Sequence, residues 1–138
     1  MPFWRMFCHL IWATKHREPL LDGNVARVVE ASLRSKCEEL KVLVHAIYLM
    51  PDHVHLAVSI PPSLSVATVV SRLKGSSSHL INHAESMSDQ AFAWQPEYGA
   101  ISFGEKQLPD VVAYIENQPE RHAARNLWAR VERISDEL

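Results

Sequence analysis

The sequence has only two cysteines among its 138 residues, Cys8 and Cys37, and they lie far apart without the C-x-x-C spacing of zinc ribbons and redox motifs. A disulfide framework or a structural zinc site is therefore not expected. No run of about 20 apolar residues occurs, and Arg5, His9 and Lys15 interrupt the apolar N-terminus, so neither a membrane span nor a signal peptide is predicted. These absences are typical of a soluble protein of the reducing cytoplasm.

The chain also lacks an excess of positive charge. Its formal net charge is -2, which argues mildly against binding to a phosphate backbone, because each neutralised phosphate needs a nearby cation. The cations are nevertheless clustered, at residues 15–17, at 72–74 and as four arginines between 121 and 133. A local basic track is therefore compatible with the sequence. The length and the 47% hydrophobic content predict one domain, residues 1–138.

Hydrophobic periodicity predicts four strands and three helices. Strands are predicted, from β-branched and aromatic residues between turn signals, at residues 5–14, 42–49, 53–60 and 98–103. Helices are predicted, from apolar residues at i, i+3 and i+4 spacing, at residues 24–40, 65–84 and 108–118, with a short helical tail after them. The order β-α-β-β-α-β-α indicates an α+β fold, a ferredoxin-like sandwich in which an antiparallel sheet carries two helices on one face. The third helix is an addition to that unit.

Two histidines stand out within the third strand, His53 and His55. Alternate residues of a strand share a face, so both imidazoles point one way, beside the small Ala57, while Val54 and Leu56 point toward the helices. The two rings should lie about 7 Å apart along the strand. Two neutral imidazoles on one rigid strand can form half of a divalent-metal site, although surface or purely structural histidines produce the same pattern.

Tyr114 and Gln118 lie four residues apart on the third predicted helix, so they project to the same side, at the edge of its apolar face. A tyrosine in such a position commonly packs its ring and leaves its hydroxyl in water. The alternative is a covalent nucleophile, which requires a group that stabilises the phenolate. A nearby metal would do so and would also polarise a phosphate.

Other conspicuous side chains are predicted to have structural roles. His9 and His45 lie inside strands and are interpreted as hydrogen-bonded sheet residues. His79 and His83 are four residues apart on the second helix, but without the glutamate of an H-E-x-x-H arrangement they are interpreted as exposed. Trp94, just before the last strand, either stacks on bases or anchors the core.

Four segments carry a family resemblance: HLIWATKHR at 9–17, MPDHVHL at 50–56, LKGSS at 73–77 and YIENQ at 114–118. Together they resemble the small TnpA-type transposases of the HUH single-tyrosine superfamily, enzymes of bacterial and archaeal insertion sequences. The likeness extends from about residue 7 to residue 122, with the four motifs in the expected order. That combination is far more specific than any one motif.

The resemblance implies that Tyr114 is the catalytic nucleophile and that His53, His55 and Gln118 bind a divalent metal, magnesium or manganese. It implies a 5′-phosphotyrosine intermediate and a free 3′-hydroxyl that can later rejoin strands. The implied substrate is single-stranded DNA with imperfect hairpins, and the implied assembly is a homodimer in which the tyrosine helix often completes the partner's site. By position, phosphate contacts are assigned to Lys15, Arg17, Arg72 and Lys74.

Two other function classes fit the same residues. One is a domesticated hairpin-DNA-binding regulator that keeps the fold and no longer cleaves. The other is a ferredoxin-like interaction module in which His53 and His55 are incidental. The regulator predicts DNA binding without a covalent product, and the module predicts binding of neither DNA nor metal.

Overall fold

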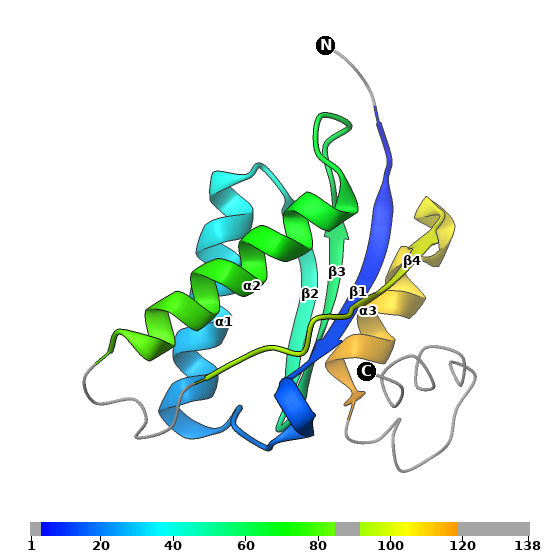
Figure 1. The fold of residues 1–138 in the computed structure, drawn as a ribbon. Helices are drawn as coiled ribbons and strands as arrows, with labels where there is room; N and C mark the ends of the chain where they lie inside the picture. The colour runs from blue at the N-terminus through cyan, green and yellow to red at the C-terminus, as the bar shows by residue number, and fades with distance from the viewer. Residues whose placement is uncertain (1–3, 85–91, 119–138) are drawn as a thin grey trace.

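The computed structural model of the protein describes residues 4–84 and 92–118, and is built on one four-stranded antiparallel sheet (Figure 1). Its strands are β1 (Phe7–Ala13), β2 (Leu43–Met50), β3 (His53–Ser59) and β4 (Gly99–Phe103). They lie in the order β2-β3-β1-β4, so β3 and β1 are central. This order places β3 between β2 and β1, as in the split β-α-β unit of ferredoxin-like folds.

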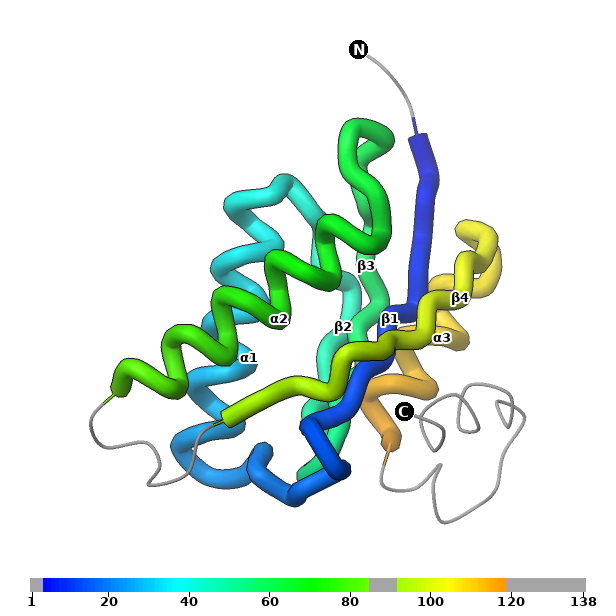
Figure 2. The backbone as a smooth tube through the Cα atoms, viewed as in Figure 1, coloured from blue at the N-terminus to red at the C-terminus, as the bar shows by residue number. Residues whose placement is uncertain are grey.

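Three helices cover the two faces of the sheet. They are α1 (Gly23–Glu39), α2 (Val66–Asn82) and α3 (Leu108–Glu116). In Figures 1 and 2, α1 and α2 lie side by side across one face, and α3 lies on the other, where it contacts β2 and β3. The predicted ferredoxin-like α+β sandwich is confirmed, with element ends within about two residues of those predicted. No helix in the described ranges is long and apolar enough to span a membrane.

The first face of the sheet carries the larger core. The apolar side chains of the central strands alternate onto this face, and Leu10, Trp12 and Leu56 are completely buried there. They pack against apolar positions of both helices, such as Leu33 of α1 and Leu73 of α2. The three-to-four-residue spacing in the helices and the two-residue spacing in the strands therefore meet in one layer.

The second face carries a smaller core under α3. Here Ile11, Ala46 and Ala57 pack against Val111 and Tyr114. The space left by the two alanines is filled by α3 side chains, so this face is covered and every residue of β3 is buried. The alternation predicted which residues share this face, but it did not reveal that the third helix covers them.

A two-residue turn, Pro51 and Asp52, joins β2 to β3, and Met50 pairs directly with His53. Both the backbone N–H and the hydroxyl of Thr14 reach the Asp52 carbonyl oxygen, at 2.9 and 3.3 Å. The turn is thereby attached to the end of β1. This attachment holds the Asp52 side chain at the start of β3, beside His53. The predicted helical tail and the four arginines of residues 121–133 lie outside the described residues.

Candidate functional site

His53 and His55 lie side by side on one face of β3, as the alternation predicts, and α3 covers that face. Their ring centroids are 5.0 Å apart, and the ring planes meet edge-on at 69°. Both are buried, with 2% and 0% of their surfaces exposed. Two buried imidazoles on one central strand have little freedom to move. The hydrogen-bond partner of each Nδ1 atom sets the tautomer and the orientation of that ring.

His53 is oriented by the carboxylate of Asp52. Its Nδ1 lies 2.7 Å from Asp52 Oδ1, and Asp52 Oδ2 accepts a hydrogen bond from Arg17 Nε at 3.1 Å. Burial opposes ionisation of Asp52, but the hydrogen bonds and charges of His53 and Arg17 outweigh it, so the pKa of this carboxyl is lowered. A carboxylate only accepts hydrogen bonds, so Nδ1 of His53 carries a proton, and in the neutral ring Nε2 holds the lone pair.

His55 is oriented by a histidine of the neighbouring strand. Its Nδ1 lies 2.9 Å from Nε2 of His9 on β1. His9 is 2% exposed, and burial lowers the pKa of its ring to about 4, so it is neutral at neutral pH and able to accept a hydrogen bond. The strand pattern predicts that His9 lies inside a strand, but it does not connect His9 with His55. The signal that could have found it is the antiparallel pairing of β1 with β3, which no periodicity reveals.

Tyr114 of α3 packs against the rings of His55 and His9. Its ring centroid is 6.1 Å from that of His55 and 6.0 Å from that of His9, in edge-on geometry. The tyrosine is completely buried, whereas the sequence placed it at the edge of the apolar face of its helix. The difference arises because α3 lies on the second sheet face and turns Tyr114 toward the strands. The tyrosine and the histidines meet within one chain.

Gln118, just beyond α3, turns its amide oxygen away from the helix. Its Nε2 donates to the Tyr114 carbonyl oxygen at 3.1 Å, and since only the NH2 group can donate, Oε1 must face the other way. Gln118 is fully buried, and its Oε1 has no hydrogen-bond partner among the described residues. A buried amide oxygen that accepts no hydrogen bond has lone pairs that can coordinate a cation.

The donor set therefore fits a divalent metal. Within residues 4–84 and 92–118, no three His, Cys, Asp or Glu side chains lie close enough to hold a metal ion together. A third donor beside the imidazoles of His53 and His55 would have to be of another type, and the amide oxygen of Gln118 is a donor of another type. Imidazole nitrogen and amide oxygen suit the divalent first-row metals, and oxygen donors suit magnesium.

Two of the predicted phosphate contacts follow β1, at its end nearest to His53. Ala13 pairs with His53, and the exposed Lys15 comes two residues later. Arg17 is half-buried and bound to Asp52, with a left-handed backbone (φ 53°) that non-glycine residues rarely adopt. Lys15 is thus available to a ligand from solvent, while Arg17 is part of the hydrogen-bond chain that leads to His53.

The other two predicted contacts are on α2, on the opposite face of the sheet. Arg72 is exposed. The amine of Lys74 donates to the backbone carbonyl oxygens of Gln95 and Glu97, both at 2.7 Å, and burial lowers its pKa to about 8. Lys74 thereby holds the segment that leads into β4 against α2.

Trp94, His79 and His83 all lie away from the histidines of β3. Trp94 is a core residue, since it is 9% exposed, packs edge-on against Trp12, and donates from Nε1 to Ser77 Oγ at 2.9 Å. The rings of His79, on α2, and His83, just after its end, stack on each other with centroids 4.0 Å apart, and both residues are exposed. The core-anchor alternative for Trp94 is the one that the structure bears out.

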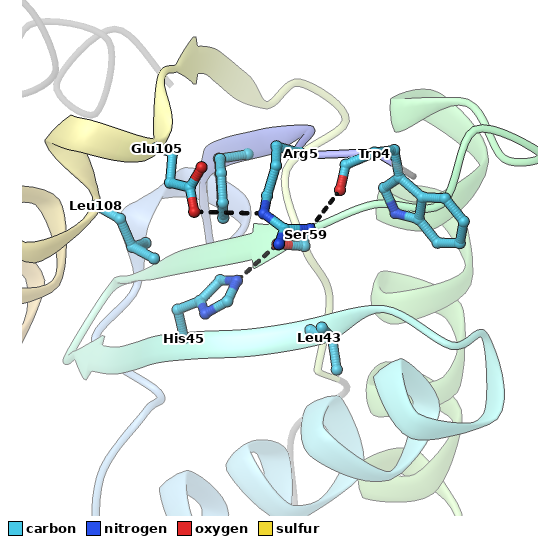
Figure 3. A pocket seen from close by; sticks show the side chains of 8 residues that line it. Trp4, Arg5, Leu43, His45, Ser59, Glu105 and Leu108 are labelled. Carbon is cyan, nitrogen blue, oxygen red and sulfur yellow. Dashed lines mark hydrogen bonds and ion pairs between the residues drawn. The ribbon is translucent and has the colours of Figure 1, made fainter. Parts of the chain in front are cut away.

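A cavity of about 480 Å3 opens on the α3 side of the sheet, where β1 and β2 begin and β3 ends (Figure 3). His45 faces Ser59 in it, with Nε2 and Oγ 2.6 Å apart, and the Arg5–Glu105 ion pair lies at its rim. None of the clustered side chains around His55 lines this cavity. His45 therefore lies on the same sheet face as His9, His53 and His55 but does not contact them.

In comparisons with known proteins, the matches are transposases. Residues 2–118 match the family described as "Transposase IS200 like". The chain is 31% identical over 117 residues to the ISDra2 transposase TnpA of Deinococcus radiodurans, covering 82% of this chain and 84% of that protein. It is 32% identical over 123 residues to the transposase of insertion sequence element IS200 from Salmonella typhimurium, covering 85% and 79%.

Two solved structures share the fold. One, from Deinococcus radiodurans and assigned as a transposase, superposes with a TM-score of 0.68 at 30% identity, covering 86% of this chain and 95% of that one. The other is a REP-associated tyrosine transposase bound to a REP hairpin, with a TM-score of 0.67 at 16% identity, covering 88% and 74%. The second likeness concerns the fold alone.

Proposed function

Since this chain belongs to the family of IS200-like transposases, we propose that it cleaves and rejoins single-stranded DNA at the hairpin-bearing ends of its element, through a covalent bond to Tyr114. The observation that carries the proposal is the buried contact of Tyr114 with His55, next to His53 on the same strand. A tyrosine hydroxyl beside a pair of imidazoles that can bind a metal has the parts needed for phosphoryl transfer.

We assign metal binding to His53 and His55 through Nε2 and to Gln118 through Oε1. When bound there, magnesium or manganese would act as a Lewis acid, withdrawing charge from the scissile phosphate. Asp52 and Arg17 keep the proton of His53 on Nδ1, so that Nε2 presents a lone pair. The hydrogen bond from Gln118 Nε2 to the Tyr114 carbonyl couples the amide to the helix that carries the nucleophile.

The reaction is a transesterification. The hydroxyl oxygen of Tyr114 forms a bond to phosphorus, the bond from phosphorus to the 3′-oxygen breaks, and the tyrosine proton ends on the leaving 3′-hydroxyl. The product is a 5′-phosphotyrosine, which a 3′-hydroxyl can later attack without a nucleotide cofactor. His53, His55, Tyr114 and Gln118 are all buried, so a DNA strand reaches them only when the part of the chain that covers them moves aside.

The proposed substrate is single-stranded DNA with imperfect hairpins, in the cytoplasm. A protein of the same fold has been solved with a REP hairpin bound, so this architecture is compatible with hairpin binding. We further propose a homodimer, which sedimentation velocity would test by giving the mass of two chains. A monomer under conditions of full activity would contradict the dimer and would agree with Tyr114 acting in its own chain.

The direct test is the polarity of the covalent product. The protein is incubated with Mn²⁺ and single-stranded DNA that carries the hairpins flanking its gene, labelled at either the 3′ or the 5′ end. We expect only the 3′-labelled strand to migrate with the protein on a denaturing gel, because the fragment downstream of the break keeps its 5′-phosphate on tyrosine. Hairpin binding without any adduct would instead support a non-cleaving regulator.

Phosphate contact by Lys15 has a separate expected result. Because Lys15 is the exposed cation nearest along the chain to the end of β1, Lys15→Ala should weaken DNA binding and reduce the slope of log K against log salt by about one. The measurement is a salt titration of hairpin binding by fluorescence anisotropy. Arg34→Ala, which removes an exposed cation paired with Glu30 on α1, is the control and should leave the slope unchanged.

A further inference from the structure

His9 is a buried histidine that touches one proposed metal ligand. It lies on β1, on the face that α3 covers, and pairs across the sheet with Ala57 of β3. Its Nε2 is 2.9 Å from His55 Nδ1, and both rings are buried to 2% exposure or less. A hydrogen bond between two buried imidazoles requires one proton between the two nitrogens, so the tautomers of the two rings are coupled.

Only one arrangement of that proton makes His55 a metal ligand. If His55 is to present a lone pair at Nε2, its proton must be on Nδ1, and Nδ1 must donate to His9 Nε2. His9 then carries its own proton on Nδ1. The opposite arrangement, in which His9 donates, would place the proton of His55 on Nε2 and block coordination there.

We propose that His9 is a positioning residue, which holds His55 in the tautomer and ring orientation that present its Nε2 to a divalent metal. The proposal rests on the proposed function, in which His55 is a metal ligand. His9 would do for His55 what Asp52 does for His53, since each Nδ1 has a hydrogen-bonding partner of its own, at 2.9 and 2.7 Å. Groups of this kind raise the affinity of a metal site without touching the metal.

The same side chain also supports the nucleophile. The His9 ring lies edge-on to that of Tyr114 at 6.0 Å, nearly the distance of His55 from Tyr114. His9 thus contacts both the ring of Tyr114 and the ring of His55, and it helps to hold the two in place. Loss of its acceptor atom should change the metal site, while loss of its ring should also loosen the packing under α3.

The test compares two variants of the full chain. His9→Leu removes the acceptor and keeps an apolar side chain, and His9→Gln can place an amide oxygen near the position of Nε2. We expect His9→Leu to weaken Mn²⁺ binding about 10- to 100-fold, measured from the paramagnetic resonance of free Mn²⁺. His9→Gln should recover most of that loss. His45→Leu, on the same face and bonded to Ser59, is the matched control and should bind as the wild type does.

A second measurement needs no variant. The ¹⁵N shifts of His55 in the metal-free wild type report its tautomer, and we expect a proton on Nδ1. A proton on Nε2, equal affinity of the wild type and a folded His9→Leu, or a His9→Gln as weak as His9→Leu would each overturn the role of His9. A wild type that binds no Mn²⁺ at all would overturn the proposed function itself, and with it the purpose assigned to His9.

Discussion

Replacing Tyr114 by phenylalanine should abolish the covalent protein–DNA adduct, lowering its rate of formation by at least about 10³-fold, because the substitution removes the hydroxyl oxygen that is proposed to form the bond. The ring itself is retained. It can still pack edge-on against His55 and His9, each about 6 Å away. Metal affinity and hairpin binding should therefore stay close to those of the wild type. The adduct is measured on a denaturing gel, and binding by anisotropy.

The chain offers its own controls for this experiment, since it has three tyrosines. Tyr48→Phe makes the same chemical change on the same face, in a residue of β2 that packs at the border of the smaller core. Tyr98→Phe makes it in an exposed residue. Both variants should form adducts at the wild-type rate. If the adduct persists in Tyr114→Phe and disappears in one of these, the nucleophile has been assigned to the wrong residue.

Replacing His53 or His55 by alanine should weaken Mn²⁺ binding by at least about 100-fold, since each change removes one of three proposed ligands, a larger loss than that of a supporting group. Adduct formation should fall in parallel, while hairpin binding should persist. The measurements are a Mn²⁺ titration and the gel assay, with circular dichroism to verify that each variant is folded. This combination separates metal-dependent chemistry from DNA recognition.

The matched controls are His79→Ala and His83→Ala. These residues also form a close histidine pair, with the centroids of the stacked rings 4.0 Å apart, but both are exposed, at the C-terminal end of α2. Removing either one should leave Mn²⁺ affinity and adduct formation unchanged. Unchanged Mn²⁺ affinity in both His53→Ala and His55→Ala would mean that these residues are not ligands, as the interaction-module alternative requires.

Much of the fold could be predicted because local rules dominate it. Strands and helices are set by two- and three-to-four-residue periodicities, and Pro109 in the first turn of α3 shows how a single residue marks an element boundary. The resemblance to TnpA-type transposases, carried by short motifs in a fixed order, is confirmed by the family match over residues 2–118. The metal-ligand, nucleophile and phosphate-contact assignments stay predictions, which the experiments above address.

The environment of the site could not be predicted in the same way. Lys74 carries the charge expected of a phosphate contact, yet its amine is bonded to two backbone carbonyls more than 20 residues away. Arg17 is likewise engaged by Asp52. Sequence reports the charge of a side chain but not its hydrogen-bond partners, because those come from segments that only the folded chain brings together.

By itself, the sequence determined the α+β class, the family and the shared face of His53 and His55, because each depends on local patterns and on the order of short motifs along the chain. Only the tertiary structure decided that α3 covers that face, that Tyr114 is buried against the histidines of its own chain, and that His9 meets His55. These contacts join residues 46 to 105 positions apart. They depend on strand register and on the face to which a helix returns, which are set by the packing of the whole sheet and not by any local pattern.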